Sequence, residues 1–121
     1  MELRSLSSFT WLLLLLLASN ATLMAQAAGK PSSGADIFNT KCTLCHAADG
    51  SGSTPLGKQL QAADLRSKDV QKLSDAEMRR IIHDGQANMP PFADDLNNEE
   101  ISQVIRYIRA LARTAKKSPS H

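Results

Sequence analysis

The chain places both of its cysteines within four residues, in the segment Cys42-Thr43-Leu44-Cys45-His46. A disulfide between them would close only a tight loop and would stabilise the fold little. Beyond residue 27, only 17 of the remaining 94 residues are Leu, Ile, Val or Phe. A chain with so few core-forming side chains has difficulty burying enough apolar surface on its own. We therefore expect something other than side chains to fill part of the interior.

The first 27 residues are predicted to be an export signal peptide. Arg4 precedes an apolar run from Phe9 to Ala18, and Ala25-Gln26-Ala27 follows as a cleavage site. This order is typical of secretory signals. A transmembrane helix needs about 20 apolar residues, and Ser19 interrupts the run before that length. We expect cleavage after Ala27 and a periplasmic protein, with membrane anchoring as the alternative if the leader is retained.

The rest of the chain is divided into a short extension (residues 28–33), one folded domain (34–113) and a flexible basic tail (114–121). Its 14 Lys and Arg residues nearly balance 12 Asp and Glu residues, for a net charge of +2. Nucleic-acid-binding domains carry a strongly basic surface, so we expect no nucleic acid among the partners.

The C-x-x-C-H pattern has three interpretations: a structural disulfide, a dithiol redox site, or the covalent attachment of haem c. A dithiol redox site is expected to follow a strand, and no strand pattern precedes Cys42. A zinc site needs four ligands, and His83 is the only other internal histidine. On a helix, Cys42, Cys45 and His46 would share one face. Two thiols can then add to the vinyl groups of a porphyrin while the imidazole reaches the iron, so we favour haem c.

A second axial ligand is expected from Met89. It follows a predicted helix from Ser74 to Asp84, and Pro90 and Pro91 hold the backbone after it extended. A thioether in such a rigid loop is well placed to approach a metal from one direction. Met78 lies on the apolar face of the helix, where core packing explains it. His83 lies on the opposite face and is expected to be solvated.

At this point the chain resembles the class I c-type cytochromes, specifically the small monohaem bacterial ones. The resemblance extends from about Gly34 to Leu111 and depends on matches that occur in a fixed order. They are Gly34-Ala-Asp-Ile-Phe38, Cys42-Thr-Leu-Cys45-His46, Gly50-Ser-Gly52, Pro55-Leu56-Gly57, Asp64-Leu65, Gly85, Met89-Pro90-Pro91-Phe92 and Ile105-Arg-Tyr107-Ile108-Arg-Ala-Leu111.

The resemblance implies an all-α fold, with three main helices and short turns wrapped around one haem. The first and last helices would cross where Gly34 and Phe38 meet Val104 and Tyr107. Independent signals support both helices. Ser33 with Asp36 can cap the first, and Asn97 with Glu100, or Asn98 alone, can begin the last. The apolar face expected for the last helix consists of Ile101, Val104, Ile105, Ile108, Leu111 and Ala112.

The resemblance also implies a role for each site residue. Cys42 and Cys45 would tether the haem, and His46 and Met89 would ligate its iron. In the family a proline carbonyl accepts the proton of the axial histidine's other nitrogen, and Pro55 is the matching position. Such a bond orients the ligand and raises its basicity. Thr54 stands where many relatives have Gly.

Histidine and methionine together leave the iron no open position, and the methionine raises the reduction potential. We therefore expect a one-electron carrier rather than an enzyme, without a small-molecule substrate. It would be a monomer with redox proteins as donors and acceptors. The alternative is a sensory or catalytic haem protein with a displaceable Met89. A third possibility is an exported dithiol oxidoreductase using Cys42 and Cys45.

Overall fold

The computed structural model describes residues 33–117. The predicted signal peptide, its cleavage site and residues 118–121 lie outside the described residues. Between 33 and 117 the chain forms six helices and no strand, in agreement with the all-α prediction. They are α2 (Gly34–Lys41), α3 (Thr43–His46), α4 (Pro55–Leu60), α5 (Lys68–Gln71), α6 (Asp75–Asp84) and α7 (Asn98–Lys117).

The three longer helices, α2, α6 and α7, correspond to the three main helices expected, and local signals begin each of them. Ser33 and Asp36 form a capping box at α2, and Ser74 and Glu77 form another at α6. At α7 the side chain of Asn97 accepts from the backbone of Glu100, whose carboxylate accepts from the Asn97 backbone. Each reciprocal pair satisfies N–H groups that the helix start leaves without intrahelical partners.

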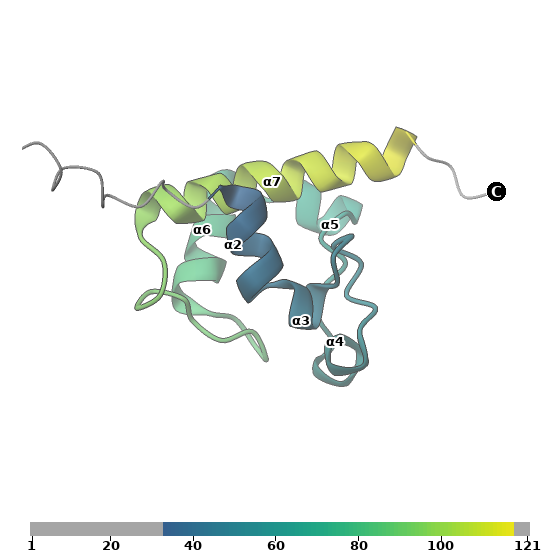
Figure 1. The fold of residues 1–121 in the computed structure, drawn as a ribbon, viewed down its shortest axis with the longest axis horizontal. Coiled ribbons are helices and arrows are strands. Elements are labelled where there is room, and N and C mark those ends of the chain that lie inside the picture. Colours follow the sequence, from purple (N-terminus) through teal and green to yellow (C-terminus); the bar gives the residue numbers. More distant parts are fainter. Residues whose placement is uncertain (1–32, 118–121) are drawn as a thin grey trace, which may run out of the picture. The chain divides into compact units, whose positions relative to one another are not determined.

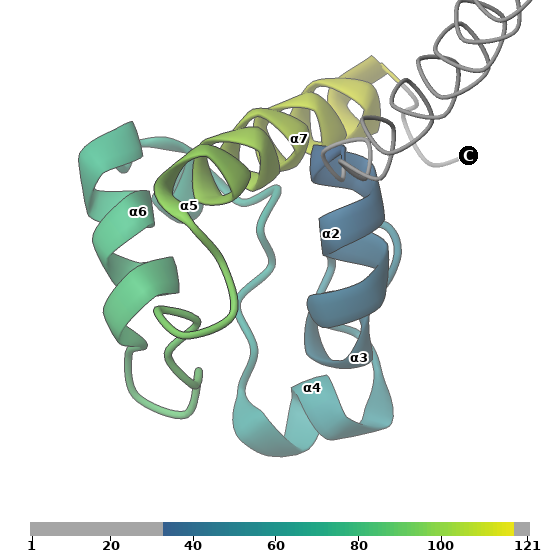
Figure 2. The ribbon, with the colours of Figure 1, turned by 60° about the vertical axis from the view of Figure 1, so that its left-hand side comes forward.

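Helix α7 is the element on which α2 and α6 both pack (Figures 1 and 2). The crossing of α2 and α7 depends on Gly34, because a Cβ there would collide with the backbone carbonyl of Gln103. One turn further along α2, the ring centroid of Phe38 lies 5.2 Å from that of Tyr107. Both contacts confirm the crossing that the family resemblance implied.

The apolar core lies beneath α7, between α2 and α6. Its fully buried side chains are Phe38, Ile101, Val104 and Ile105, and around them lie Ile37, Leu65, Met78, Ile82, Leu96, Ile108 and Ala112. The burial of Met78 and the exposure of His83 both agree with their predicted places on α6. Leu111 is only half-buried, in contrast to the rest of the predicted face of α7.

The last helix extends past the predicted end of the domain. The predicted domain ends at residue 113, and α7 ends at Lys117. Residues 113–117 are exposed, so the extension depends on backbone hydrogen bonding and on Lys116 and Lys117 near the negative end of the helix dipole. Within residues 33–117, no helix is long and apolar enough to span a bilayer.

Candidate haem-binding site

The C-x-x-C-H segment forms a single helical turn directly after α2. Cys42 ends α2 by donating its backbone N–H to the carbonyl of Phe38, and its own carbonyl accepts from His46 N at 2.9 Å. Helix α3 then places Cys45 and His46 one turn further on. The side chain of Cys42 packs against the core. Cys42, Cys45 and His46 therefore lie within about one helical turn of backbone.

The environment of Cys42 is unsuited to dithiol chemistry. Burial raises the pKa of the Cys42 thiol to about 11, and the nearby Lys41 only partly opposes this shift. The thiol is therefore protonated at neutral pH. Dithiol oxidoreductases depend on the reverse arrangement, in which an electropositive setting lowers the pKa of the attacking cysteine. The structure thus weighs against the dithiol interpretation.

His46 is the one polar residue of the described chain that lies buried with the core, with 8% of its surface exposed. Its Nδ1 lies 3.0 Å from the carbonyl oxygen of Ala63. Because a carbonyl only accepts, Nδ1 must carry the proton, and Nε2 keeps its lone pair. Burial lowers the pKa of His46, and the bond to Ala63 partly opposes the shift. The ring is therefore neutral at physiological pH, which is the form that binds metals.

The acceptor of this hydrogen bond corrects the prediction for Pro55. Pro55 is the first residue of α4 and is exposed, and the carbonyl that receives the His46 proton belongs to Ala63 instead. Proline is well suited to the first position of a helix, because no intrahelical partner exists there for an N–H. Thr54 and Pro55 together begin a helix, and the chain returns past His46 eight residues later.

The segment that carries Ala63 is braced on both sides. Leu65 N donates to Gly50 O at 2.8 Å, which joins the segment to the loop after α3. The guanidinium of Arg66 contacts Asp64 at 2.9 Å and Asp49 at 3.0 Å. These contacts, together with the N–H of Ala62 on Gly57 O, hold the backbone beside the imidazole. A main-chain acceptor has no side-chain signature, so sequence analysis alone could not have identified Ala63.

Thr54 connects α4 to the C-x-x-C-H turn. Its hydroxyl donates to the carbonyl of Leu44 at 2.7 Å and accepts from Gly57 N at 2.8 Å. Gly57 itself lies against the carbonyl of Cys45, so closely that a Cβ at position 57 would collide with it. The departure from Gly at position 54 therefore gives this chain a side-chain contact between α4 and the end of α3.

Met89 lies in the segment between α6 and α7, where it is half-buried and packs against the core. Gln86 and Met89 exchange two backbone hydrogen bonds, of 3.1 and 2.9 Å, and form a tight turn. Gly85 has a positive φ of 77°, and a Cβ there would lie 2.7 Å from the Met89 carbonyl. Phe92 N then donates to Ile82 O at 3.0 Å, which returns the segment to α6.

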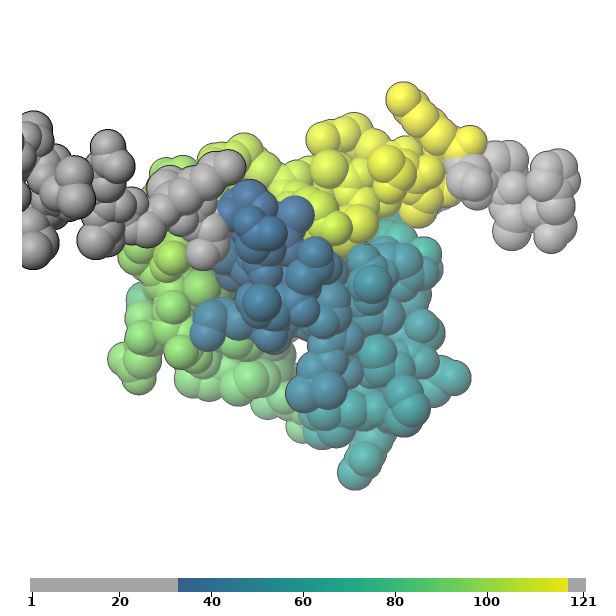
Figure 3. Space-filling model, viewed as in Figure 1, coloured from purple at the N-terminus to yellow at the C-terminus, as the bar shows by residue number. Residues whose placement is uncertain are grey.

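The two halves of the site lie on different parts of the fold. The space-filling view shows an opening in the surface between α3 and the segment that follows α6 (Figure 3). On one side are the turn with its two free thiols and the neutral imidazole, whose Nε2 has no hydrogen-bond partner among residues 33–117. On the other side is the segment of Met89. The two thiols are the groups that covalent attachment of haem c needs, and imidazole and thioether are both known axial ligands of haem iron.

Five large apolar side chains belong to segments near the proposed site: Leu65 and Ile82 are buried, whereas Leu56, Ile81 and Phe92 are half-buried. Large apolar side chains that are half-buried in a small domain are available to contact a further group.

Comparison with known proteins gives a consistent result. The family model for "Cytochrome C oxidase, cbb3-type, subunit III" matches residues 29–108. A cytochrome c6 of Bryopsis maxima is 33% identical over 75 residues, which are 62% of this chain and 84% of the relative. A cytochrome c6 of Rippkaea orientalis is 34% identical over 85 residues, which are 70% of this chain and 74% of the relative.

The fold has a matching solved structure. The KustC0563 c-type cytochrome superposes with a TM-score of 0.60 at 30% sequence identity, covering 65% of this chain and 96% of that one. Proteins of this kind carry covalently bound haem c and are electron-transfer proteins rather than enzymes. On the fold, the C-x-x-C-H turn and these matches, the chain belongs to the small monohaem class I c-type cytochromes.

Proposed function

We propose that this chain is a periplasmic one-electron carrier in which Cys42 and Cys45 hold the haem, and His46 and Met89 ligate its iron. The observation that carries the proposal is the hydrogen bond from His46 Nδ1 to the Ala63 carbonyl. That bond selects the tautomer in which Nε2 is free to bind a metal. It also restrains the rotation of the ring, as the outer partners of ligating histidines do.

Each residue has a distinct part in electron transfer. When bound, haem supplies an iron that gains or loses one electron. His46 is held neutral and oriented by Ala63, and Met89 is held in a short turn behind Gly85. Holding His46 and Met89 in place would reduce the structural change between oxidation states. Cys42 and Met89 pack against the buried core, which would limit the access of water to the haem and so favour its reduced form.

The proposal is tested with optical spectra of the oxidised and reduced protein and of two methionine variants. Met89→Ala should abolish the near-infrared charge-transfer band of the ferric form and lower the reduction potential. Met78→Leu, a volume-conserving change in the core, should leave both unchanged. If Met89→Ala keeps the band and the potential, Met89 is not the ligand. An iron that binds external ligands readily in the unaltered protein would favour the sensory or catalytic alternative.

The partners are proposed to be redox proteins that meet the carrier as a free monomer. The matching family model is named for a subunit of an oxidase, whereas the matching relatives are cytochromes c6. Gel filtration of a native, detergent-solubilised whole-cell extract distinguishes the two arrangements. A free carrier elutes at the size of one chain, and a subunit elutes with a membrane-enzyme complex. Periplasmic location predicts a mature N-terminus at Ala28, which Edman sequencing reads directly.

A further inference from the structure

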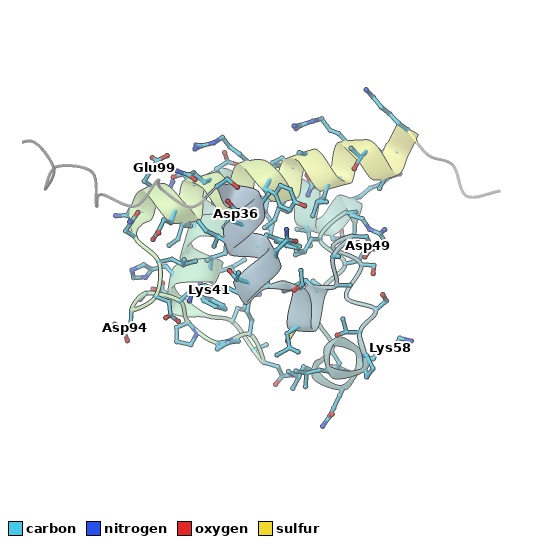
Figure 4. The ribbon with its side chains drawn as sticks, viewed as in Figure 1. Asp36, Lys41, Asp49, Lys58, Asp94 and Glu99 are labelled. Atoms are coloured by element: carbon cyan, nitrogen blue, oxygen red, sulfur yellow. The ribbon has the colours of Figure 1, made fainter. Side chains whose placement is uncertain are left out.

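Two polar side-chain contacts join the Met89 segment to the side of the fold that carries His46. The amide Nδ2 of Asn88 donates to the carbonyl of Leu60 at 3.0 Å. The ammonium of Lys41, at the end of α2, lies 3.4 Å from a carboxylate oxygen of Asp95. Figure 4 labels Lys41 and also Asp94, the residue that precedes Asp95 in the chain. Met89 lies between the two contact points in sequence.

Both contacts are made by exposed side chains, and they differ in the groups that they satisfy. The Lys41 and Asp95 side chains are 35% and 58% exposed, so that solvent and salt screen their attraction. The acceptor of Asn88, in contrast, is the carbonyl of the last residue of α4. The last carbonyls of a helix have no intrahelical partner, so the Asn88 amide satisfies one of them. The hydrogen bond therefore satisfies a carbonyl at the end of α4 and also attaches the turn of Asn88 to that helix.

The turn around Asn88 transmits this contact to its neighbour. Gln86 and Met89 are joined by backbone hydrogen bonds in both directions, and Ala87 between them has a φ of 52°. A turn closed in this way moves as a unit. Fixing Asn88 against α4 therefore also fixes the backbone from which the Met89 thioether projects.

We propose that Asn88 is a positioning residue for the Met89 ligand, acting through its hydrogen bond to the Leu60 carbonyl. The inference rests on the proposed ligation by Met89. Breaking the bond lets the Met89 turn move away from α4 and shifts the equilibrium toward a folded state in which the thioether has left the iron. An external ligand then competes with Met89 more easily.

The test is a spectrophotometric titration of the ferric holoprotein with imidazole. Asn88→Ala and Asn88→Asp both remove the donor, and Asn88→Asp keeps the side-chain size. Gln86→Ala is the matched control, because its exposed side chain lies in the same turn and makes no hydrogen bond to residues 33–117. A neutral hydrogen bond contributes about 0.5–1.5 kcal/mol. Both Asn88 variants should therefore bind imidazole about two- to tenfold more tightly than the unaltered protein.

Each outcome is decisive. Imidazole affinity compares two folded states, so a loss of global stability alone does not change it. Tighter binding in both Asn88 variants, with Gln86→Ala unchanged, supports the inference. Equal affinity in all four proteins overturns it, as does an equal increase in Gln86→Ala. Should the unaltered protein lack the near-infrared band, the proposed Met89 ligation fails first, and the inference fails with it.

Discussion

The imidazole Nδ1 of His46 donates a hydrogen bond to the carbonyl oxygen of Ala63, 17 residues later in the chain, at 3.0 Å. The bond crosses from the C-x-x-C-H turn to a segment that the loop after α3 and the Arg66 side chain hold in place. The bond keeps the proton on Nδ1 and so leaves the lone pair of Nε2 available to bind a metal.

We therefore expect the Nδ1 proton of His46 to be visible and slow to exchange in the reduced holoprotein. Heteronuclear NMR with labelled histidine should show a hydrogen-bond coupling from Nδ1 to the Ala63 carbonyl. The ring signals should not titrate between about pH 5 and pH 8, where free histidine does. A coupling to the Pro55 carbonyl, or a ring that titrates in this range, would contradict the arrangement.

Thr54→Val should destabilise the protein by about 1–2 kcal/mol, because it removes both a helix cap and the bond to the Leu44 carbonyl. Thr54→Ser keeps the hydroxyl and should remain within about 0.5 kcal/mol of the unaltered protein. Ser67→Ala provides the control, since Ser67 caps α5 without reaching the C-x-x-C-H turn. Guanidinium unfolding measures all three. Equal losses for Thr54→Val and Ser67→Ala would show that the contact with Leu44 contributes nothing.

Gly85→Ala should weaken the ligation by Met89. A Cβ at position 85 would lie 2.7 Å from the Met89 carbonyl and 2.9 Å from Pro91 N. The positive φ adds about 1–2 kcal/mol of backbone strain. Gly50→Ala is the matched control, because its φ of 78° is similar but its Cβ would make an ordinary 3.4 Å contact with Leu111.

The near-infrared band of the ferric protein is followed as the pH is raised. Gly85→Ala should lose the band at a lower pH than the unaltered protein does. Gly50→Ala should be less stable but should keep the band to the same pH as the unaltered protein. If both variants keep the band to the same pH, the close approach at Gly85 does not position Met89.

The Asp64–Arg66 pair predicts a dependence of stability on pH. The hydrogen bond from Arg66 holds the pKa of the Asp64 carboxyl below its ordinary value of 3.8. The native state therefore favours the ionised carboxyl. The stabilisation that ionised Asp64 contributes is fully present above its ordinary pKa, and it is lost as the pH falls through the lower pKa of the native state. Because the Asp64 side chain is 41% exposed, we expect only about 0.5–1 kcal/mol.

Asp64→Asn should accordingly lower the free energy of unfolding at pH 6, and the difference from the unaltered protein should disappear toward pH 2. Asp69→Asn is the control, since the side chains of Asp69 and Lys72 are far more exposed than those of Asp64 and Arg66. Denaturant unfolding across this pH range measures both variants. If the difference in free energy of unfolding between Asp64→Asn and the unaltered protein grew as the pH fell, the pKa of Asp64 would be raised rather than lowered in the native state.

Much of the architecture could be predicted because its signals are local. Ser33, Ser74 and Asn97 mark the starts of the three long helices through side chains only three residues from their partners. The C-x-x-C-H turn follows from helical spacing in the same way. The crossing of α2 and α7 is not local, and its prediction came from the family resemblance.

The sequence by itself determined the helix starts, the turn that carries Cys42, Cys45 and His46, and the position of Met89 in a non-helical segment. Only the tertiary structure decided that Ala63 rather than Pro55 receives the His46 proton, and that Asn88 contacts the end of α4. The physical reason is the same for both. Each acceptor is a main-chain carbonyl, which every residue has, and only the path of the folded chain selects the one that comes within reach.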